Sequence, residues 1–191
     1  LSIAEFGRVA LVTKRGISNT NTNWAQGGIA AVLHPEDSVG AHAADTLRVG
    51  YGLCRERIVD MVVGEGPERL RELIALGAEF CLSEDGQGLD LTREGGHSAR
   101  RIVHAGDVTG REIQRVLVEA TLAHPNIQLF EEHMAIDLIE RSNFSADSGV
   151  AGAYVFDVNS SEVHVFAATR ATVLATGGAG KVYLYTSNPD V

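Results

Sequence analysis

The stretch Arg8-Val-Ala-Leu-Val-Thr13 is a short apolar run that lies between Gly7 and Lys14. A run of this length, bounded by turn-forming and polar residues, is typical of a buried parallel strand. Residues 1–6, which precede it, are typical of the last turns of a helix that Gly7 ends. The chain therefore opens in the middle of a motif, and we expect it to be a segment of a longer protein.

Downstream of this strand the apolar residues recur with helical spacing. Gly64 and Pro67 predict an interruption of the second helix. In the third helix, Thr109 and Glu112 have the pattern of a capping box, with a hydroxyl at the N-cap and a carboxylate three residues later. His124-Pro-Asn126 ends this helix. The predicted helices cover residues 38–49, 57–76 and 109–123, and the predicted loops cover residues 15–23 and 83–100.

After Asn126 the apolar period changes to about two residues, which is typical of strands. The predicted strands cover residues 127–130, 135–140, 150–158 and 163–168. Polar connections join the last three, so they are expected to form an antiparallel meander. Ala171-Thr-Val-Leu-Ala-Thr176 is predicted to be a buried strand that runs into Gly177-Gly-Ala-Gly180.

This order of elements is typical of an α/β fold with an inserted layer of strands. It fits a flavin-binding dinucleotide (Rossmann-like) fold better than a nicotinamide-binding one. No GxGxxG precedes the strand at residues 8–13, and that strand ends in Lys14 rather than in an acid that would bind a ribose hydroxyl. A plain nicotinamide-binding domain is therefore excluded.

Composition narrows the function further. The 191 residues are 45% hydrophobic and carry a formal charge of -9, which opposes binding to nucleic acid or to an anionic membrane. No apolar run approaches the about 18 residues of a membrane span, and no secretory signal opens the chain. Cys54 and Cys81 form no CxxC motif and are interpreted as buried thiols in a reducing compartment. A cytoplasmic location is the expectation.

Three polar or glycine-rich segments could carry a ligand. Residues 19–28 alternate amides and hydroxyls before a glycine pair, and residues 176–180 are a glycine turn after a strand. Residues 92–98, with Arg100 and Arg101, place a Glu, a His and three Arg around a glycine-rich loop that could bind a dicarboxylate or a charged amine. A solvated loop, a plain turn and an exposed charged loop are the respective alternatives.

Other chemistries lack their motifs. Ser98 beside His97 is not part of a GxSxG elbow, so a hydrolase is not indicated. His97, His104 and Asp107 lack the spacing of metal ligands, and no metal site is predicted. The remaining histidines are interpreted as surface or hydrogen-bonded residues, namely His34, His42, His124, His133 and His164.

Taken together, these segments resemble the flavoprotein family that includes L-aspartate oxidase and the flavoprotein subunits of succinate dehydrogenase and fumarate reductase. The resemblance spans nearly the whole chain in the family's order. It implies that residues 1–191 are part of an FAD-binding domain, with a first strand upstream of Leu1 and with capping and C-terminal helical domains downstream of Val191. The motifs that carry it are Arg8–Lys14, Trp24-Ala-Gln-Gly-Gly-Ile-Ala-Ala31, Thr92–Arg101, His104–Glu112, His124–Asn126 and Ala175–Tyr183.

Two positions discriminate within the family. Asn21 stands where the dehydrogenases and reductases carry the histidine that binds FAD covalently, so the resemblance implies non-covalent FAD. Glu94 stands where the dehydrogenases tend to carry an apolar residue. By resemblance, Glu94 orients the amino group of L-aspartate, a group that succinate lacks. Both positions indicate the L-aspartate oxidase branch.

The resemblance also assigns residues to FAD. Met134 and Ala135 would offer backbone groups to the adenine, whereas Asp107, Thr109 and Gly110 are interpreted as structural residues at a helix start. No residue of this chain is predicted to be catalytic, because the family's catalytic arginine is expected beyond Val191. The predicted FAD contacts are Lys14, Asn21, Thr22, Asn23, Trp24, Ala25, Gln26, Gly27, Gly28, Met134, Ala135, Gly177 and Gly178.

The implied reaction is oxidation of L-aspartate to iminoaspartate with FAD, with oxygen or fumarate as the final electron acceptor. Iminoaspartate would serve quinolinate synthase in NAD biosynthesis. We expect the isolated chain to be inactive and to bind FAD weakly or not at all. A soluble fumarate reductase or succinate dehydrogenase-type flavoprotein and a catalytically inert segment, associating as a homo-oligomer through an open sheet edge, are the alternatives.

Overall fold

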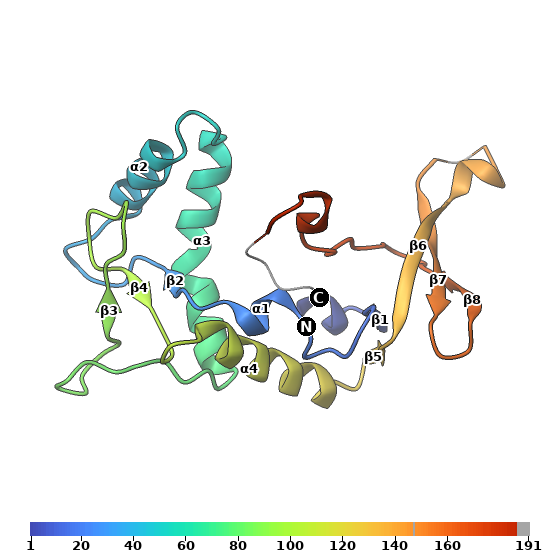
Figure 1. The fold of residues 1–191 in the computed structure, drawn as a ribbon, viewed down its shortest axis with the longest axis horizontal. Helices are drawn as coiled ribbons and strands as arrows, with labels where there is room; N and C mark the ends of the chain where they lie inside the picture. The colour runs from blue at the N-terminus through green and yellow to red at the C-terminus, as the bar shows by residue number, and fades with distance from the viewer. Residues whose placement is uncertain (147, 187–191) are drawn as a thin grey trace. The chain divides into compact units, whose positions relative to one another are not determined.

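The computed structural model describes residues 1–146 and 148–186. The chain folds into two compact units. Unit 1 comprises Leu1–Asn21 and Val118–Val191, and unit 2 comprises Thr22–Leu117. The elements of both units are labelled in Figure 1.

Unit 1 begins with a single 3-10 turn, η1 (Ser2–Glu5), and strand β1 (Val9–Val12). β1 pairs in parallel with β5 (Ile127–Phe130), and Val9 lies opposite Ile127. The predicted parallel pairing is confirmed, but the strand is not buried: Ala10 and Leu11 are exposed, because among the described residues β5 is the one strand that pairs with it. The turn before it is 3-10 rather than the end of an α-helix.

The predicted meander of unit 1 is confirmed. Strands β6 (His133–Glu140), β7 (Val150–Asp157) and β8 (Glu162–Ala167) are antiparallel neighbours in that order. The short 3-10 turn η2 (Arg141–Asn143) follows β6. The ring of Phe130 on β5 meets that of Phe166 on β8 edge to face, 4.7 Å between centroids, so the meander packs against the parallel pair.

The buried strand predicted at residues 171–176 is wrong. These residues form neither helix nor strand, and Val173 is 65% exposed. An apolar run becomes a strand only where a neighbouring strand supplies backbone hydrogen bonds. Within the described residues, β5 is the one strand that pairs with β1, and no strand pairs with this run. The 3-10 turn η3 (Gly180–Val182) follows it.

Unit 2 combines helices with a small antiparallel sheet. The sheet has the strand order β2-β4-β3, with Ile29 opposite Val103 and Leu91 also opposite Val103. The last helix, α4, carries the chain from unit 2 into unit 1. The elements are α1 (Asn21–Trp24), β2 (Ile29–Ala30), α2 (Val39–Val49), α3 (Glu56–Ala75), β3 (Leu91–Thr92), β4 (Ile102–Val103) and α4 (Thr109–Ala123).

Helix α3 is continuous, so the predicted interruption near Pro67 is wrong. A proline inside a helix lacks the N–H that would bond to the carbonyl one turn earlier. Val63 on one side of Pro67 and Leu70 on the other are both buried, and their packing holds the two halves of the helix in line. Ile74, one turn after Leu70 in the same helix, is 41% exposed.

The capping box predicted for α4 does not form. Thr109 lies inside the helix, and its hydroxyl accepts a hydrogen bond from the Ala105 N–H at 3.1 Å. The Glu112 carboxylate accepts from the Glu79 N–H at 2.7 Å and pairs with Arg115 at 2.6 Å. Both side chains therefore bind the preceding segment of the chain instead of the free amides of the first turn.

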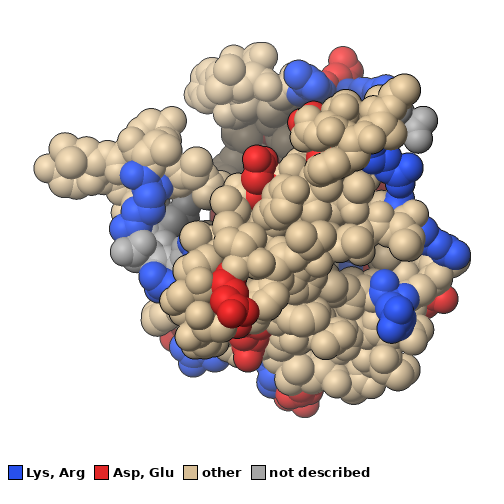
Figure 2. Space-filling view, turned by 90° about the vertical axis from the view of Figure 1, so that its right-hand side faces the viewer, with Lys and Arg blue, Asp and Glu red and all other residues tan. Residues whose placement is uncertain are grey.

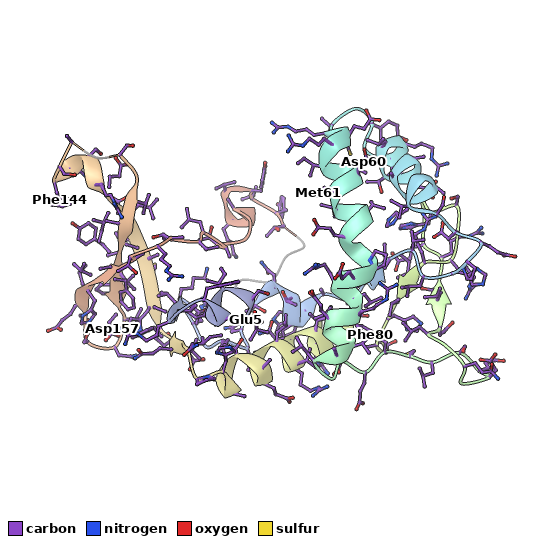
Figure 3. All side chains as sticks on the ribbon, turned by 180° about the vertical axis from the view of Figure 1, so that it is seen from behind. Glu5, Asp60, Met61, Phe80, Phe144 and Asp157 are labelled. Atoms are coloured by element: carbon purple, nitrogen blue, oxygen red, sulfur yellow. The ribbon has the colours of Figure 1, made fainter. Side chains whose placement is uncertain are left out.

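The core of unit 2 lies where α3, α4 and the small sheet meet. Phe80, which follows α3 in the sequence, is labelled at the end of that helix in Figure 3 and is buried there. The buried members of this core are Ala31, Leu70, Ala78, Phe80, Val103 and Val116. A second, smaller core joins α2 to α3 through Ala43, Val59 and Val63.

One face of the surface shows how charged and uncharged residues are distributed. Figure 2 shows a face made mostly of uncharged residues, on which acidic and basic side chains both occur. In the described part of the chain, no helix is long and apolar enough to cross a membrane.

Leu70 tests the assignment of the core. Its side chain is 1% exposed, so we expect Leu70→Ala to lower the free energy of unfolding by about 3 kcal/mol through lost burial and the cavity that remains. The control Leu53→Ala removes the same atoms from a residue that is 92% exposed and should change the free energy by less than about 0.5 kcal/mol. Urea unfolding followed by circular dichroism measures both, and equal losses would contradict this core.

Candidate functional site

The segment Thr22–Gly28, predicted to contact FAD, lies on the surface of unit 2. The carbonyl of Ala25 accepts a hydrogen bond from the Gly110 N–H at 2.9 Å. A Cβ on Gly110 would lie 1.8 Å from the Thr22 carbonyl oxygen, so only glycine allows the start of α4 to come this close. The interpretation of Gly110 as a structural residue is confirmed.

The other end of this segment is held by β4. A Cβ on Gly28 would lie 2.3 Å from the Val103 carbonyl oxygen, and the Ala31 N–H donates to the Arg101 carbonyl at 2.9 Å. The backbone of the segment is thus fixed at both ends by close packing. Trp24 and Gln26 remain exposed between these two anchors.

In unit 1 the structure brings Lys14 close to Met134. The residues that precede them are hydrogen-bonded to each other, because the His133 N–H donates to the Thr13 carbonyl at 3.0 Å. Both Lys14 and Met134 are exposed. The end of β1 and the start of β6 therefore lie side by side, with the side chains of two residues predicted to contact FAD exposed there.

Sequence reasoning missed one residue beside Lys14. The Glu131 carboxylate, just past β5, accepts a hydrogen bond from the Ile17 N–H at 2.5 Å and so fixes the turn that follows Lys14. An acidic residue after a strand gives no signal of this role in the sequence, because its partner is 114 residues away.

The glycine turn at Gly177-Gly178 lies in the exposed coil after β8, with Gly177 at φ +70. Arg170, at the start of this coil, donates to the Phe6 carbonyl at 2.9 Å. Lys14, Met134 and this turn belong to unit 1, whereas Thr22–Gly28 belongs to unit 2. That all of them meet one FAD stays a prediction.

The loop at residues 93–100 has two unlike parts. Glu94 is exposed, whereas Arg101 is 0% exposed at the other end. Arg101 donates to both oxygens of Asp37, at 2.7 and 2.8 Å, and to Asp45 at 2.7 Å. A guanidinium that is paired with two carboxylates has no free charge to bind a substrate. Arg101 therefore has a structural role.

These contacts set the ionisation of the cluster. The Arg101 guanidinium, through its hydrogen bonds, holds the pKa of Asp37 below its ordinary value, and Asp37 in turn raises the pKa of Arg101. The Ser98 hydroxyl and amide, and then Arg101, hold the pKa of Asp45 far below its ordinary value. All three groups are therefore charged at neutral pH.

His42, interpreted as a surface or hydrogen-bonded histidine, is neither. It is buried on α2, and its Nδ1 has no hydrogen-bond partner among the described residues. Burial lowers its pKa, and the neighbouring positive charge of Arg101 lowers it further. Its ring lies 5.6 Å from that of His97. His42 is therefore a neutral imidazole next to the Arg101 cluster.

The donor set suits a flavin dinucleotide. The exposed groups of the predicted site are one cation (Lys14) together with amide, hydroxyl and indole groups, which donate to phosphate and carbonyl oxygens without adding negative charge. Among the described residues, no cluster of three or more His, Cys, Asp or Glu could hold a metal ion. The residues present fit FAD.

Comparison with known proteins decides the family. The model of the FAD binding domain family matches residues 1–191, the whole chain. The chain belongs to this family. An FAD-binding α/β fold is thereby confirmed, and FAD is the cofactor that the family binds.

Two similar proteins carry the name L-aspartate oxidase. The chain is 50% identical to L-aspartate oxidase 2-a, chloroplastic, of Nicotiana tabacum, and 44% identical to L-aspartate oxidase of Vibrio cholerae, over 100% of its own length in both cases. It spans 29% and 36% of these two relatives, about a third of their length.

Among solved structures, FrdA of Escherichia coli quinol fumarate reductase superposes with a TM-score of 0.88 at 32% identity. The match covers 96% of this chain and 30% of that chain. Mycobacterium smegmatis Sdh1 superposes with a TM-score of 0.83 at 33% identity, over 95% of this chain and 32% of that one. The FAD-binding fold of these flavoproteins is therefore shared.

Gly110→Ala tests the anchor of the Thr22–Gly28 segment in a full-length enzyme that carries this chain. The added Cβ must displace backbone, so we expect the affinity for FAD to fall by about 10-fold or more. Gly64→Ala is the matched control, because that helical glycine has nothing within 4 Å of the added Cβ. Flavin fluorescence titration of the apoprotein measures both variants, and an unchanged affinity in Gly110→Ala would exclude this anchor.

His42 predicts a pH dependence of stability. Its folded pKa is lowered, so the unfolded state takes up the proton first as the pH falls below about 6.5 and stability declines. Asp37 and Asp45, whose pKa values are also lowered, lose their contribution only as the pH falls below about 4. Urea midpoints between pH 8 and pH 5.5 should therefore fall less in His42→Gln than in the wild type. The exposed control His164→Gln should keep the wild-type slope.

Proposed function

We propose that this chain carries part of the FAD site and the substrate-recognising loop of an enzyme that oxidises L-aspartate to iminoaspartate. One structural observation supports it most directly. Glu94 is exposed on a loop whose nearby buried arginine, Arg101, is already neutralised by Asp37 and Asp45. Beside the exposed Arg93, the loop therefore presents the Glu94 carboxylate, which suits an ammonium group. Relatives 44–50% identical carry the name L-aspartate oxidase.

FAD, when bound, supplies the oxidant that takes a hydride from the substrate Cα. This chain's own residues bind FAD and orient the substrate. The proposed FAD contacts are Lys14, the segment 21–28, Met134 with Ala135, and Gly177 with Gly178. Because Asn21 has an amide in place of an imidazole, it forms no histidyl link, and FAD is held non-covalently.

The proposed role of Glu94 follows from the difference between two substrates. L-aspartate and succinate share both carboxylates, and the ammonium of L-aspartate is the group that distinguishes them. A charge-assisted hydrogen bond from that ammonium to Glu94 favours L-aspartate and holds its Cα in one orientation. The same carboxylate has no partner on succinate, so it contributes nothing to the binding of that dicarboxylate.

A fumarate reductase-type activity is the second candidate. It is favoured by the superposition on FrdA with a TM-score of 0.88, although the identity there is 32% against 50% for the Nicotiana tabacum oxidase. A catalytically inert segment is the third. We propose that the isolated chain does not turn over L-aspartate, since it spans about a third of its relatives.

The surrounding biology is proposed on the same basis. Oxygen or fumarate would accept the electrons, and quinolinate synthase would consume the iminoaspartate in NAD biosynthesis. The cytoplasmic location stays a prediction, and the plant relatives are named chloroplastic. A homo-oligomer also stays a prediction.

Glu94→Gln in a full-length enzyme that carries this chain tests the proposal. We expect kcat/KM for L-aspartate to fall roughly 10- to 100-fold, because the amide leaves the ammonium without its counter-charge. Inhibition by succinate should change less than about twofold. Glu84→Gln, another exposed acid of unit 2, is the matched control and should leave both constants unchanged. Steady-state kinetics measure all three enzymes.

Two outcomes would contradict the proposal. Equal changes in the handling of L-aspartate and succinate would remove the role of Glu94. Fumarate reduction without any L-aspartate turnover by the wild-type enzyme would instead favour the second candidate.

A further inference from the structure

Asp45 is the point at which helix α2 holds the end of the loop that carries Glu94. Its side chain points into unit 2, and the residue is 7% exposed. One carboxylate oxygen, Oδ2, accepts from the Ser98 N–H at 2.7 Å and from the Ser98 hydroxyl at 2.6 Å. Asp45 thus binds both donors of one loop residue.

The same carboxylate joins the loop to two arginines. Its Oδ2 also accepts from Arg101 at 2.7 Å, and its Oδ1 accepts from Arg48 at 2.8 Å. Arg48 in turn donates to the Gly96 carbonyl at 2.8 Å. Asp45 and Arg48, one turn apart on α2, therefore hold the loop at two residues, Gly96 and Ser98.

The middle of the loop fits closely against α2. Gly96 has φ +90, a left-handed conformation that favours glycine, and a Cβ there would lie 2.9 Å from Cγ1 of Val49. The Nδ1 of His97 lies 3.3 Å from the Arg101 guanidinium. Because a guanidinium only donates, Nδ1 of His97 is the acceptor in this contact.

Helix α2 is a firm support for these contacts. Ser38 caps its first turn, accepting from the Ala41 N–H at 3.1 Å. Ala43 packs with Val59 and Val63 of α3. The loop itself contains no helix or strand at residues 93–100, so its geometry depends on what it binds. The His97 N–H reaches the Glu94 carbonyl at 3.3 Å and closes the turn that starts at Glu94.

We propose that Asp45 is a positioning residue, which holds the loop at residues 94–98 so that Glu94 meets the substrate ammonium. The proposal rests on the function proposed above and extends it to a residue that does not touch the substrate. Asp45 acts through Ser98 and the Glu94–His97 turn. Arg101 keeps its two bonds to Asp37 when Asp45 is altered, so the effect falls on the loop.

Asp45→Asn in a full-length enzyme that carries this chain tests it. The amide keeps the size of the side chain but replaces one acceptor by a donor, so Ser98 and Arg48 cannot both be bound. We expect KM for L-aspartate to rise about 10-fold and kcat to change less than about threefold. The inhibition constant of succinate, which has no ammonium, should stay within about twofold. Arg69→Ala, which breaks an exposed pair with Glu72 on α3, is the control and should leave all constants unchanged.

A double-variant cycle separates positioning from a general structural effect. If Asp45 acts through Glu94, then Asp45→Asn combined with Glu94→Gln should raise KM for L-aspartate little beyond Glu94→Gln alone. FAD content and the visible flavin spectrum should match the wild type. If Asp45→Asn does not fold, Ser98→Ala replaces it in this experiment. Ser98→Ala removes the hydrogen bond from the Ser98 hydroxyl to Asp45 and leaves the Asp45–Arg101 pair intact. It should raise KM about threefold.

The outcomes distinguish this proposal from the function on which it rests. Multiplying effects in the double variant, or equal increases of KM for L-aspartate and of the succinate inhibition constant, would overturn the role of Asp45 while L-aspartate oxidation stands. A wild-type enzyme without L-aspartate turnover would overturn both. An increase of KM for L-aspartate in the double variant that is smaller than the product of the two single increases, together with unchanged succinate inhibition, would establish Asp45 as a positioning residue.

Discussion

The buried guanidinium of Arg101 is the constraint on which unit 2 depends. A charge removed from water is costly unless it is paired and its hydrogen bonds are made. Arg101 meets this need with Asp37, just before α2, and Asp45, on α2. Since Arg101 also precedes β4, the pairing fixes helix, sheet and loop to one another within unit 2. Removal of one partner from such a cluster typically costs about 3–5 kcal/mol.

The proposed site depends on the Arg101 cluster for its geometry, but the charge of Arg101 does not take part in the site. Glu94 is exposed, and the cluster satisfies Arg101 internally. The segment Thr22–Gly28 is fixed separately by Gly110 and by β4. Rigid anchors with exposed side chains between them are what a ligand site requires, because binding then costs little ordering. In unit 1, Glu131 fixes the turn after Lys14 by accepting a hydrogen bond from the Ile17 N–H.

Local patterns in the sequence predicted most of the fold. The apolar run at residues 8–13 and the alternating strands after Asn126 specify their own secondary structure, and the meander follows from short polar connections. The failures share one cause: long-range partners outweighed local signals. Packing on both sides of Pro67 keeps α3 continuous, and Glu112 bonds to Glu79 rather than to its own helix start. Among the described residues, no strand is placed where it could pair with residues 171–176. In the candidate site, the motif containing Arg101 was visible in the sequence, whereas its partners Asp37 and Asp45 lie more than fifty residues away.

The most direct test is a crystal structure of a full-length enzyme that carries this chain, with FAD and L-aspartate bound. The account predicts the Glu94 carboxylate within hydrogen-bond distance of the substrate ammonium, Ser98 bound to Asp45, and Arg101 still buried between its two carboxylates. An Arg101 turned out to a substrate carboxylate, or a Glu94 directed away from the ligand, would contradict it.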